Sequence, residues 1–282
     1  MDAKAIKERE KQTWTNTAPG WKKHDDVITN GAKPVADRML ELAAVGPGQR
    51  VLDIASGTGE PALSAAVLVG ESGSVLGTDL VDAMLEVARG KAAARGFSNI
   101  EFRHVDGEAI EFDANSFDAA TCRWGLMFMP DPVGCLRRAF AALKPGARMC
   151  ASTWADPPRV PFASLPMMVL KKHLEVPAPT PGSPGIFGLA DPKGLVAIMT
   201  EAGFSDVAIE DFDIQLMETK DGAEYWDIMG DLAGPITALI KQLPEDKQEQ
   251  VHAEIVEAAD AKRSGDTLKI GGITLIVSGL KA

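Results

Sequence analysis

The segment from residue 50 to residue 69 restricts the fold of this chain more than any other. RVLDIA (50–55) has the apolar character of a buried strand, and Gly57, Gly59 and an apolar stretch that begins at Pro61 follow it directly. Glycine lets the backbone take unusual angles and approach a ligand closely. The first turn of a helix offers free N–H donors to an anionic group or to ribose oxygens. The segment therefore predicts a strand, a ligand-binding loop and a helix, in that order.

A carboxylate follows the predicted strand, loop and helix at a position where it could bind a ribose. Asp79 ends the next strand-like run, SVLGTD (74–79), twenty residues after Gly59. A carboxylate at this place can accept hydrogen bonds from both hydroxyl groups of a ribose. The loop, Gly57-x-Gly59-x-x-Ala62, also fits a loose dinucleotide pattern, so a nicotinamide or flavin enzyme is an open alternative at this point.

Two further acids favour a different ligand. Asp53 lies four residues before Gly57, where it would repel a pyrophosphate but attract a ligand that carries an ammonium group. Asp106 ends a third strand-like run, where its carboxylate can accept a hydrogen bond from an adenine amino group. The acids thus favour a nucleoside with a cationic group over a dinucleotide.

Short apolar runs alternate with helix-like patterns through the middle of the chain. Strands are expected at five runs, namely 50–55, 74–79, 99–106, 117–122 and 147–153. Strands that alternate with helices at this spacing predict an α/β fold with a parallel sheet covered on both faces.

The chain is expected to form three regions around that sheet. Residues 1–45 would be an N-terminal helical lid, residues 46–155 the ligand-binding core, and residues 156–282 the completion of the sheet. The last region would contain a helical insertion at about 221–263, whose apolar residues recur at three- and four-residue steps. Gly271-Gly272 predicts a turn or a bulge near the end of the chain.

Composition restricts the class of protein and its partners. The 282 residues are 45% hydrophobic and 24% charged, as in ordinary globular proteins, and the net charge of −11 with only pairs of basic residues disfavours nucleic-acid substrates. Apolar stretches fall short of the ~20 residues that span a bilayer, and the N-terminus lacks a signal-peptide core. Cys122, Cys135 and Cys150 have no C-x-x-C spacing and predict buried free thiols. We therefore expect a cytoplasmic protein with a small-molecule substrate, either a monomer or a homodimer.

The chain resembles the class I S-adenosylmethionine-dependent methyltransferases, and more narrowly the branch of the ubiquinone and menaquinone C-methyltransferases. The matching stretches are LDIASGTGEPAL (52–63), VLGTDLVDAML (75–85), HVDGEAIEFDANSFDAATCRWGLMFMPDP (104–132) and LRRAFAALKPGARM (136–149). They occur in the family's order and spacing over about residues 50–150. The resemblance implies a Rossmann-like, seven-stranded, mostly parallel sheet whose last strand is antiparallel, with 206–216 and 268–280 as the final two strands. It also implies S-adenosylmethionine as cofactor and S-adenosylhomocysteine as its product.

The resemblance implies a cofactor site at the ends of the first four strands. The methionine part would contact Asp53, Ser56, Gly57, Gly59, Arg123 and Trp124; the ribose would bind Asp79; the adenine would lie beside Leu80, Met84, Asp106, Gly107 and Glu108. No metal is expected, because the catechol type of metal site needs acids directly after the fourth strand, and Arg123-Trp124-Gly125 stands there.

The expected reaction is methyl transfer to a small, fairly apolar organic molecule, with C- or O-methylation of a quinol or phenol favoured. A phenol or quinol carbon would need a base or an anion stabiliser, for which His24 and Arg123 are the candidates. Substrate-pocket residues would include Trp21, Met127, Tyr225 and Trp226. Three alternatives stay open: an N- or S-methyltransferase of a specialised metabolite, a nicotinamide-dependent oxidoreductase, and a non-catalytic protein that binds S-adenosylmethionine.

Overall fold

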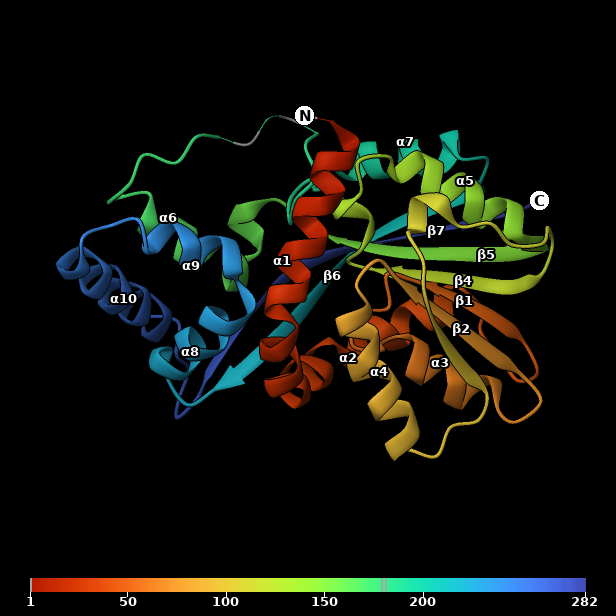
Figure 1. The fold of residues 1–282 in the computed structure, drawn as a ribbon, viewed down its shortest axis with the longest axis horizontal. Coiled ribbons are helices and arrows are strands. Elements are labelled where there is room, and N and C mark those ends of the chain that lie inside the picture. Colours follow the sequence, from red (N-terminus) through yellow and green to blue (C-terminus); the bar gives the residue numbers. More distant parts are fainter. Residues whose placement is uncertain (1, 179, 181) are drawn as a thin grey trace.

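A seven-stranded sheet organises the chain (Figure 1), which a computed structural model describes at residues 2–178, 180 and 182–282. The strands lie in the order β3-β2-β1-β4-β5-β7-β6. The parallel strands are β1 (Arg50–Ile54), β2 (Ser74–Asp79), β3 (Ile100–His104), β4 (Phe117–Arg123) and β5 (Leu143–Trp154). β7 (Leu268–Leu280) is antiparallel to its neighbours β5 and β6 (Ser205–Thr219). The predicted fold class is thereby confirmed.

Helices follow the strands as the sequence pattern predicts. They are α3 (Ala62–Val69) after β1, α4 (Asp82–Ala94) after β2, α5 (Pro132–Ala142) after β4 and α7 (Pro192–Glu201) before β6. The starts of α5 and α7 share one device, a proline in the first turn preceded by an aspartate. The Asp131 carboxylate accepts a hydrogen bond from the Gly134 N–H at 2.8 Å, and Asp191 caps α7 in the same way.

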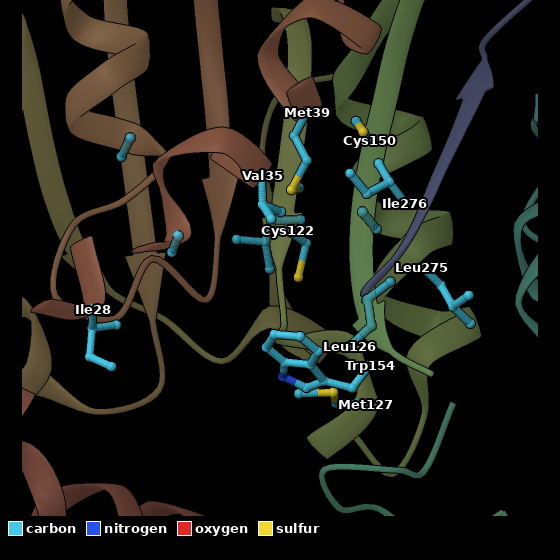
Figure 2. Packing of buried hydrophobic residues seen from close by; sticks show 14 of the residues in the cluster. Ile28, Val35, Met39, Cys122, Leu126, Met127, Cys150, Trp154, Leu275 and Ile276 are labelled. Atoms are coloured by element: carbon cyan, nitrogen blue, oxygen red, sulfur yellow. The ribbon is translucent and has the colours of Figure 1, made fainter. Parts of the chain in front are cut away.

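The core lies between the sheet and its helices and includes the second N-terminal helix, α2 (Asp25–Leu42). Figure 2 shows Val35 and Met39 of α2 beside Cys122 of β4, with Cys150 of β5 close by. The three cysteines are buried and free, as predicted. Helix α2 is therefore part of the packed core.

The first helix, α1 (Ala3–Lys23), has a different place. It packs against α4 on one side and against α8 and α9 on the other, and Figure 1 shows it standing upright between these two groups. Gly20 allows the closest approach, because a Cβ atom there would lie 2.5 Å from the Asp231 carbonyl oxygen.

Four helices gather beyond the far ends of β6 and β7 (Figure 1) and are called the helical cap here: α6 (Pro161–Leu170), α8 (Gly222–Leu232), α9 (Gly234–Ile240) and α10 (Glu245–Asp260). Three of them belong to the segment between β6 and β7, where the sequence predicts a helical insertion. In the described part of the chain, no helix is both long and apolar enough to cross a bilayer.

The end of the chain forms one continuous strand rather than a pair joined at Gly271-Gly272. The irregularity lies in its partner, β6, whose pairing register shifts between Ile214 and Met217. A Cβ atom on Gly271 would lie 1.8 Å from the Ile214 carbonyl oxygen, so this glycine is needed where the bulge of β6 presses on β7. Of the two predicted alternatives, the turn is wrong; a bulge is present, but its extra residue lies in β6 opposite Gly271.

Candidate functional site

A cleft of about 1020 Å³, its open mouth included, lies at the carboxyl ends of the first four strands and beside α1. Eleven of the predicted cofactor and substrate residues line it: Trp21, Ser56, Gly57, Asp79, Leu80, Met84, Asp106, Gly107, Glu108, Arg123 and Trp124. Residues from four strand ends meet here because parallel strands present their carboxyl ends at the same edge of a sheet.

The loop after β1 forms the floor of this cleft. Gly57 has a φ of 54°, and a Cβ atom on it would meet nothing within 4 Å, so the backbone here faces open space. Gly59 has a φ of 110°, and a Cβ atom there would lie 2.8 Å from the Leu63 side chain. The first glycine thus leaves room for a ligand, whereas the second lets the loop pack on α3.

Asp79 is held by the backbone on both sides. Its Oδ2 accepts a hydrogen bond from the Gly57 N–H at 2.9 Å, and its Oδ1 accepts one from the Val81 N–H at 2.8 Å. Burial raises the pKa of this carboxyl, although the two backbone donors oppose the shift. Each carboxylate oxygen can accept a second hydrogen bond, so Asp79 still has acceptor sites for a diol.

The third strand end carries a charged cluster that α1 completes. The Asp106 Oδ1 accepts a hydrogen bond from the Glu108 N–H at 2.9 Å. Lys7 of α1 places its Nζ 2.7 Å from Asp106 Oδ2 and 2.7 Å from Glu108 Oε2. Lys7 was missed by sequence reasoning, because it lies 99 residues before Asp106 in a stretch of ordinary charged residues.

The end of β4 contributes a buried cation. The Nε and Nη2 of Arg123 donate to the Glu60 carbonyl oxygen at 3.2 and 3.1 Å, and the guanidinium lies 4.6 Å from the centre of the Trp124 ring. Burial lowers the pKa of Arg123. Trp124 is itself fixed, because its ring stacks on Trp154 at 4.5 Å and its indole N–H donates to Thr274 at 2.9 Å.

Asp53 lies below the loop and does not line the cleft. It is fully buried, and its Oδ1 accepts a hydrogen bond from the Thr121 hydroxyl at 2.7 Å. Burial raises the pKa of Asp53 to about 7, although the nearby Arg123 charge opposes the shift. The predicted contact of Asp53 with a ligand stays a prediction.

Aromatic side chains form the wall that α1 contributes. The rings of Trp14 and Trp21 lie 5.8 Å apart, and Trp14 meets Phe128 edge-on at 5.1 Å. All three line the cleft. The contact between Trp14 and Phe128 has no signal in the sequence, since the pattern of α1 gives no register against the loop after β4.

Besides Asp53, five predicted site residues do not line the cleft: Gly59, His24, Met127, Tyr225 and Trp226. His24 faces α8, where its Nε2 lies 2.8 Å from Asp231 Oδ2. The Tyr225 hydroxyl donates to the Phe162 carbonyl oxygen at 2.7 Å, and Trp226 packs on His252 within the helical cap. These contacts link elements of the fold to one another.

Among residues 2–178, 180 and 182–282, no group of three or more His, Cys, Asp or Glu side chains is arranged to hold a metal ion.

The model of the ubiE/COQ5 methyltransferase family matches residues 7–169. The ubiquinone/menaquinone biosynthesis C-methyltransferase UbiE of Azotobacter vinelandii is 39% identical over 135 residues, which are 47% of this chain and 53% of that protein. The chain therefore spans about half the length of this relative. UbiE of Cronobacter sakazakii is 31% identical over 207 residues, 70% of this chain and 82% of that protein.

Two solved structures share the fold at low sequence identity. The cyclase SpnF superimposes with a TM-score of 0.58 at 22% identity, covering 89% of this chain and 81% of its own. Haemonchus contortus phosphoethanolamine N-methyltransferase 2, solved with S-adenosyl-L-methionine, gives a TM-score of 0.54 at 19% identity, covering 88% of this chain and 52% of its own. At such identities the likeness shows the fold alone.

Proposed function

The chain belongs to the ubiE/COQ5 methyltransferase family, and on that premise we propose that it transfers a methyl group from S-adenosylmethionine to a small, fairly apolar organic molecule. One observation carries the proposal. The glycine loop, Asp79 and Asp106 surround a single cleft, and all of them lie in the segment that matches the family.

The groups around the cleft suit this cofactor in kind and in number. The Asp79 carboxylate suits a ribose diol, and Asp106 suits an adenine amino group beside Leu80 and Met84. Asp53 Oδ2 and Arg123 Nη1 are buried and have no hydrogen-bond partner among the residues that the structure describes, so they can serve an ammonium and a carboxylate group. When bound, S-adenosylmethionine supplies an electrophilic methyl group on a sulfonium that leaves readily.

The protein's own contribution is alignment and the exclusion of water. The glycine loop, held to Asp79 by the Gly57 N–H, fixes the backbone under the ligand. Trp14 and Trp21 cover the cleft from α1, and Phe128 closes the wall beside them. A site that holds two reactants in line without water lowers the barrier mainly through orientation.

The apolar, aromatic wall supports a quinol- or phenol-like acceptor over a highly charged one. N- or S-methylation of another metabolite is the second candidate, since aromatic walls also suit amines and thioethers. Of the two residues predicted as catalytic, Arg123 borders the cleft and His24 faces α8, so we retain Arg123 in the site. We also retain a reducing compartment such as the cytoplasm, because the three cysteines are free thiols.

Titration calorimetry tests the cofactor half of this proposal. S-adenosylhomocysteine should bind and NAD should not; binding of NAD alone would favour the nicotinamide-dependent alternative.

The reaction needs a separate test, because the fold also occurs in the cyclase SpnF and does not specify methyl transfer. The purified chain is incubated with methyl-labelled S-adenosylmethionine and a panel of quinols, phenols, amines and thiols. Label in a quinol or phenol supports the proposal. Cofactor binding without transfer to any member of a broad panel would favour the non-catalytic alternative.

A further inference from the structure

One carboxylate at the cleft, that of Glu10 in α1, has no role in the site so far. Glu10 lines the cleft, and its side chain is only 14% exposed. Its Oε1 accepts hydrogen bonds from Arg9 Nε at 3.3 Å and from Arg9 Nη2 at 3.0 Å, and no described residue donates to its Oε2. Arg9 is the adjacent residue and is itself half exposed, so this pair contributes little to stability. Glu10 therefore keeps one carboxylate oxygen free.

The other ionisable groups that line the cleft are already engaged. They are Lys7, Glu60, Asp79, Asp106, Glu108 and Arg123. The two oxygens of Asp79 accept hydrogen bonds from backbone N–H groups, and this carboxylate is the one suited to the ribose. Lys7 pairs with Asp106 and Glu108 together, since its Nζ lies 2.7 Å from an oxygen of each. These three acids therefore serve the cofactor end of the cleft.

The two ionisable groups nearer the glycine loop are also unsuited to accept a proton. The Glu60 Oε2 accepts hydrogen bonds from the Ser64 N–H and hydroxyl at 3.2 and 2.7 Å, and its Oε1 lies 3.7 Å from Arg95 Nη1. The guanidinium of Arg123 donates hydrogen bonds and does not accept them. Glu10 is thus the carboxylate at the cleft that is left for proton transfer.

Glu10 shares one face of α1 with residues that reach two other parts of the cleft. Lys7, three residues earlier, contacts the acids beside which the adenine is proposed to lie. Trp14, four residues later, meets Phe128 edge-on at 5.1 Å. Residues three and four apart on a helix are neighbours. The carboxylate of Glu10 therefore lies between the adenine end of the cleft and its aromatic wall.

A phenol or quinol that attacks a methyl group has to lose the proton of its hydroxyl, and His24, the predicted base, faces α8. We propose that Glu10 is the general base that takes this proton from the acceptor. The inference rests on the proposed function, because it names the residue that activates the acceptor there. General bases contribute about 10²- to 10⁴-fold to the rate of a reaction.

The proton that Glu10 accepts has a defined course in either kind of methylation. In methylation on oxygen, the hydroxyl proton moves to Glu10 while the oxygen forms its bond to the methyl group, and the bond between methyl and sulfur breaks with its electron pair left on sulfur. Glu10 then passes the proton to water. In methylation on carbon, the same deprotonation places negative charge on the ring carbon that attacks. That carbon afterwards loses its own proton to water, and Glu10 returns its proton to the oxygen.

The test compares two acceptors that differ in acidity: the phenol or quinol that the parent chain methylates best, and its nitro-substituted counterpart. The first has a pKa of about 10 and needs a base at pH 8, whereas the second is already largely ionised. Glu10→Gln should lower kcat for the first about 100-fold or more, and for the second less than about threefold. Between pH 7 and pH 9 its remaining rate with the first should rise about tenfold per pH unit, following the ionised acceptor.

Affinity for S-adenosylhomocysteine separates this role from one in the cofactor site. Glu10→Gln should change that affinity less than about twofold in titration calorimetry. Glu10→Asp, which keeps a carboxylate on a shorter side chain, should recover part of the rate with the less acidic acceptor. Glu8→Gln is the matched control: Glu8 is exposed on the same helix and does not line the cleft, so its loss should leave both acceptors unaffected.

Three results in Glu10→Gln would overturn the inference: equal losses with both acceptors, no loss with either, or weaker binding of S-adenosylhomocysteine. The last result would assign Glu10 to the cofactor instead. If Glu10→Gln does not fold, Glu10→Asp decides by the same comparison, with a partial loss confined to the less acidic acceptor. A parent chain that binds S-adenosylhomocysteine but methylates no phenol or quinol would refute the proposed acceptor class, which is a different result because no variant enters it.

Discussion

The helical cap contains buried aromatic side chains and the cleft contains partly buried ones, and the two regions differ in what the polar atoms of Tyr225 and Trp21 do. In the cap, the Tyr225 hydroxyl donates to the Phe162 carbonyl oxygen, and Trp226 packs on His252. In the cleft, the Trp21 N–H is buried without a partner in the described chain. The apolar helix faces of both regions look alike in sequence. The paired hydroxyl of Tyr225 agrees with a packing role for that residue, and the unpaired N–H of Trp21 agrees with the proposed ligand site.

The largest effect is expected for Trp226→Ala, which tests whether Trp226 is a packing residue of the cap. Trp226 is 8% exposed, so truncation should lower the free energy of unfolding by about 3–5 kcal/mol, as for other core tryptophans. Chemical denaturation measures this loss, and affinity for S-adenosylhomocysteine in the folded fraction should be unchanged. Met168→Ala, at a cap side chain that is 64% exposed, is the control and should cost less than about 0.5 kcal/mol. An altered KM for the acceptor, with an unaltered free energy of unfolding, would instead support the prediction that Trp226 lines the substrate pocket.

The buried carboxyl of Asp53, near the cleft, should make the free energy of unfolding depend on pH. Its pKa is about 7 in the folded chain, against an ordinary value of 3.8, so the fold favours the protonated carboxyl. The Asp53 contribution to stability is therefore fully present below about pH 4 and is lost as the pH rises to about 7, by up to about 4 kcal/mol. Asp53→Asn should remove this decline, so the difference in unfolding free energy between variant and parent should grow from pH 4 to pH 7. A difference independent of pH would contradict the raised pKa that burial gives this carboxyl.

Asp79→Ala tests the floor of the cleft. Loss of a carboxylate that suits a ribose diol should weaken binding of S-adenosylhomocysteine at least about tenfold in titration calorimetry. The Gly57 N–H also loses its acceptor, which adds to the effect. Asp82→Ala is the matched control, because Asp82 begins α4 and pairs with the surface residue Arg89. Unchanged affinity for S-adenosylhomocysteine in Asp79→Ala would show that Asp79 does not bind the ribose.

The smallest effect is expected at Lys7. This cleft residue has charged partners within the chain, as the polar groups of the helical cap do. Lys7 is partly exposed and pairs with Asp106 and Glu108, and such pairs contribute up to about 1 kcal/mol. Lys7→Met should speed dissociation of S-adenosylhomocysteine by up to about fivefold, measured by stopped-flow tryptophan fluorescence. Added salt should act on the parent protein in the same direction and much less on the variant.

The parts of the molecule that could be predicted are those whose structure depends on residues close together in the sequence. The five parallel strands, the glycine loop and the acids at the strand ends have signals within a few residues, and sheet topology then brings Asp79 and Asp106 to one edge. Lys7 could not be found in this way, because only the packing of α1 across the end of β3 brings it to Asp106. The helical period of residues 221–263 predicted a buried face correctly, but a period does not say what covers that face, and Trp226 meets His252 instead of lining the cleft. The position of the bulge could not be predicted either, because it depends on a contact between two strands: the bulge lies in β6, and Gly271 of β7 only accommodates it.

The segment that carries α8, α9 and α10 leaves and rejoins the sheet at a single point. Thr219, the last residue of β6, is paired with Leu268, the first residue of β7, so the ends of the intervening segment are already side by side. The entropy of closing such a segment depends only weakly on its length. A different set of helices grafted between these two residues would keep the strand register, but it would have to replace the contacts that α8 and α9 make with α1. The segment between Thr219 and Leu268 therefore supports the cleft indirectly, because it holds the helix that carries Trp14 and Trp21.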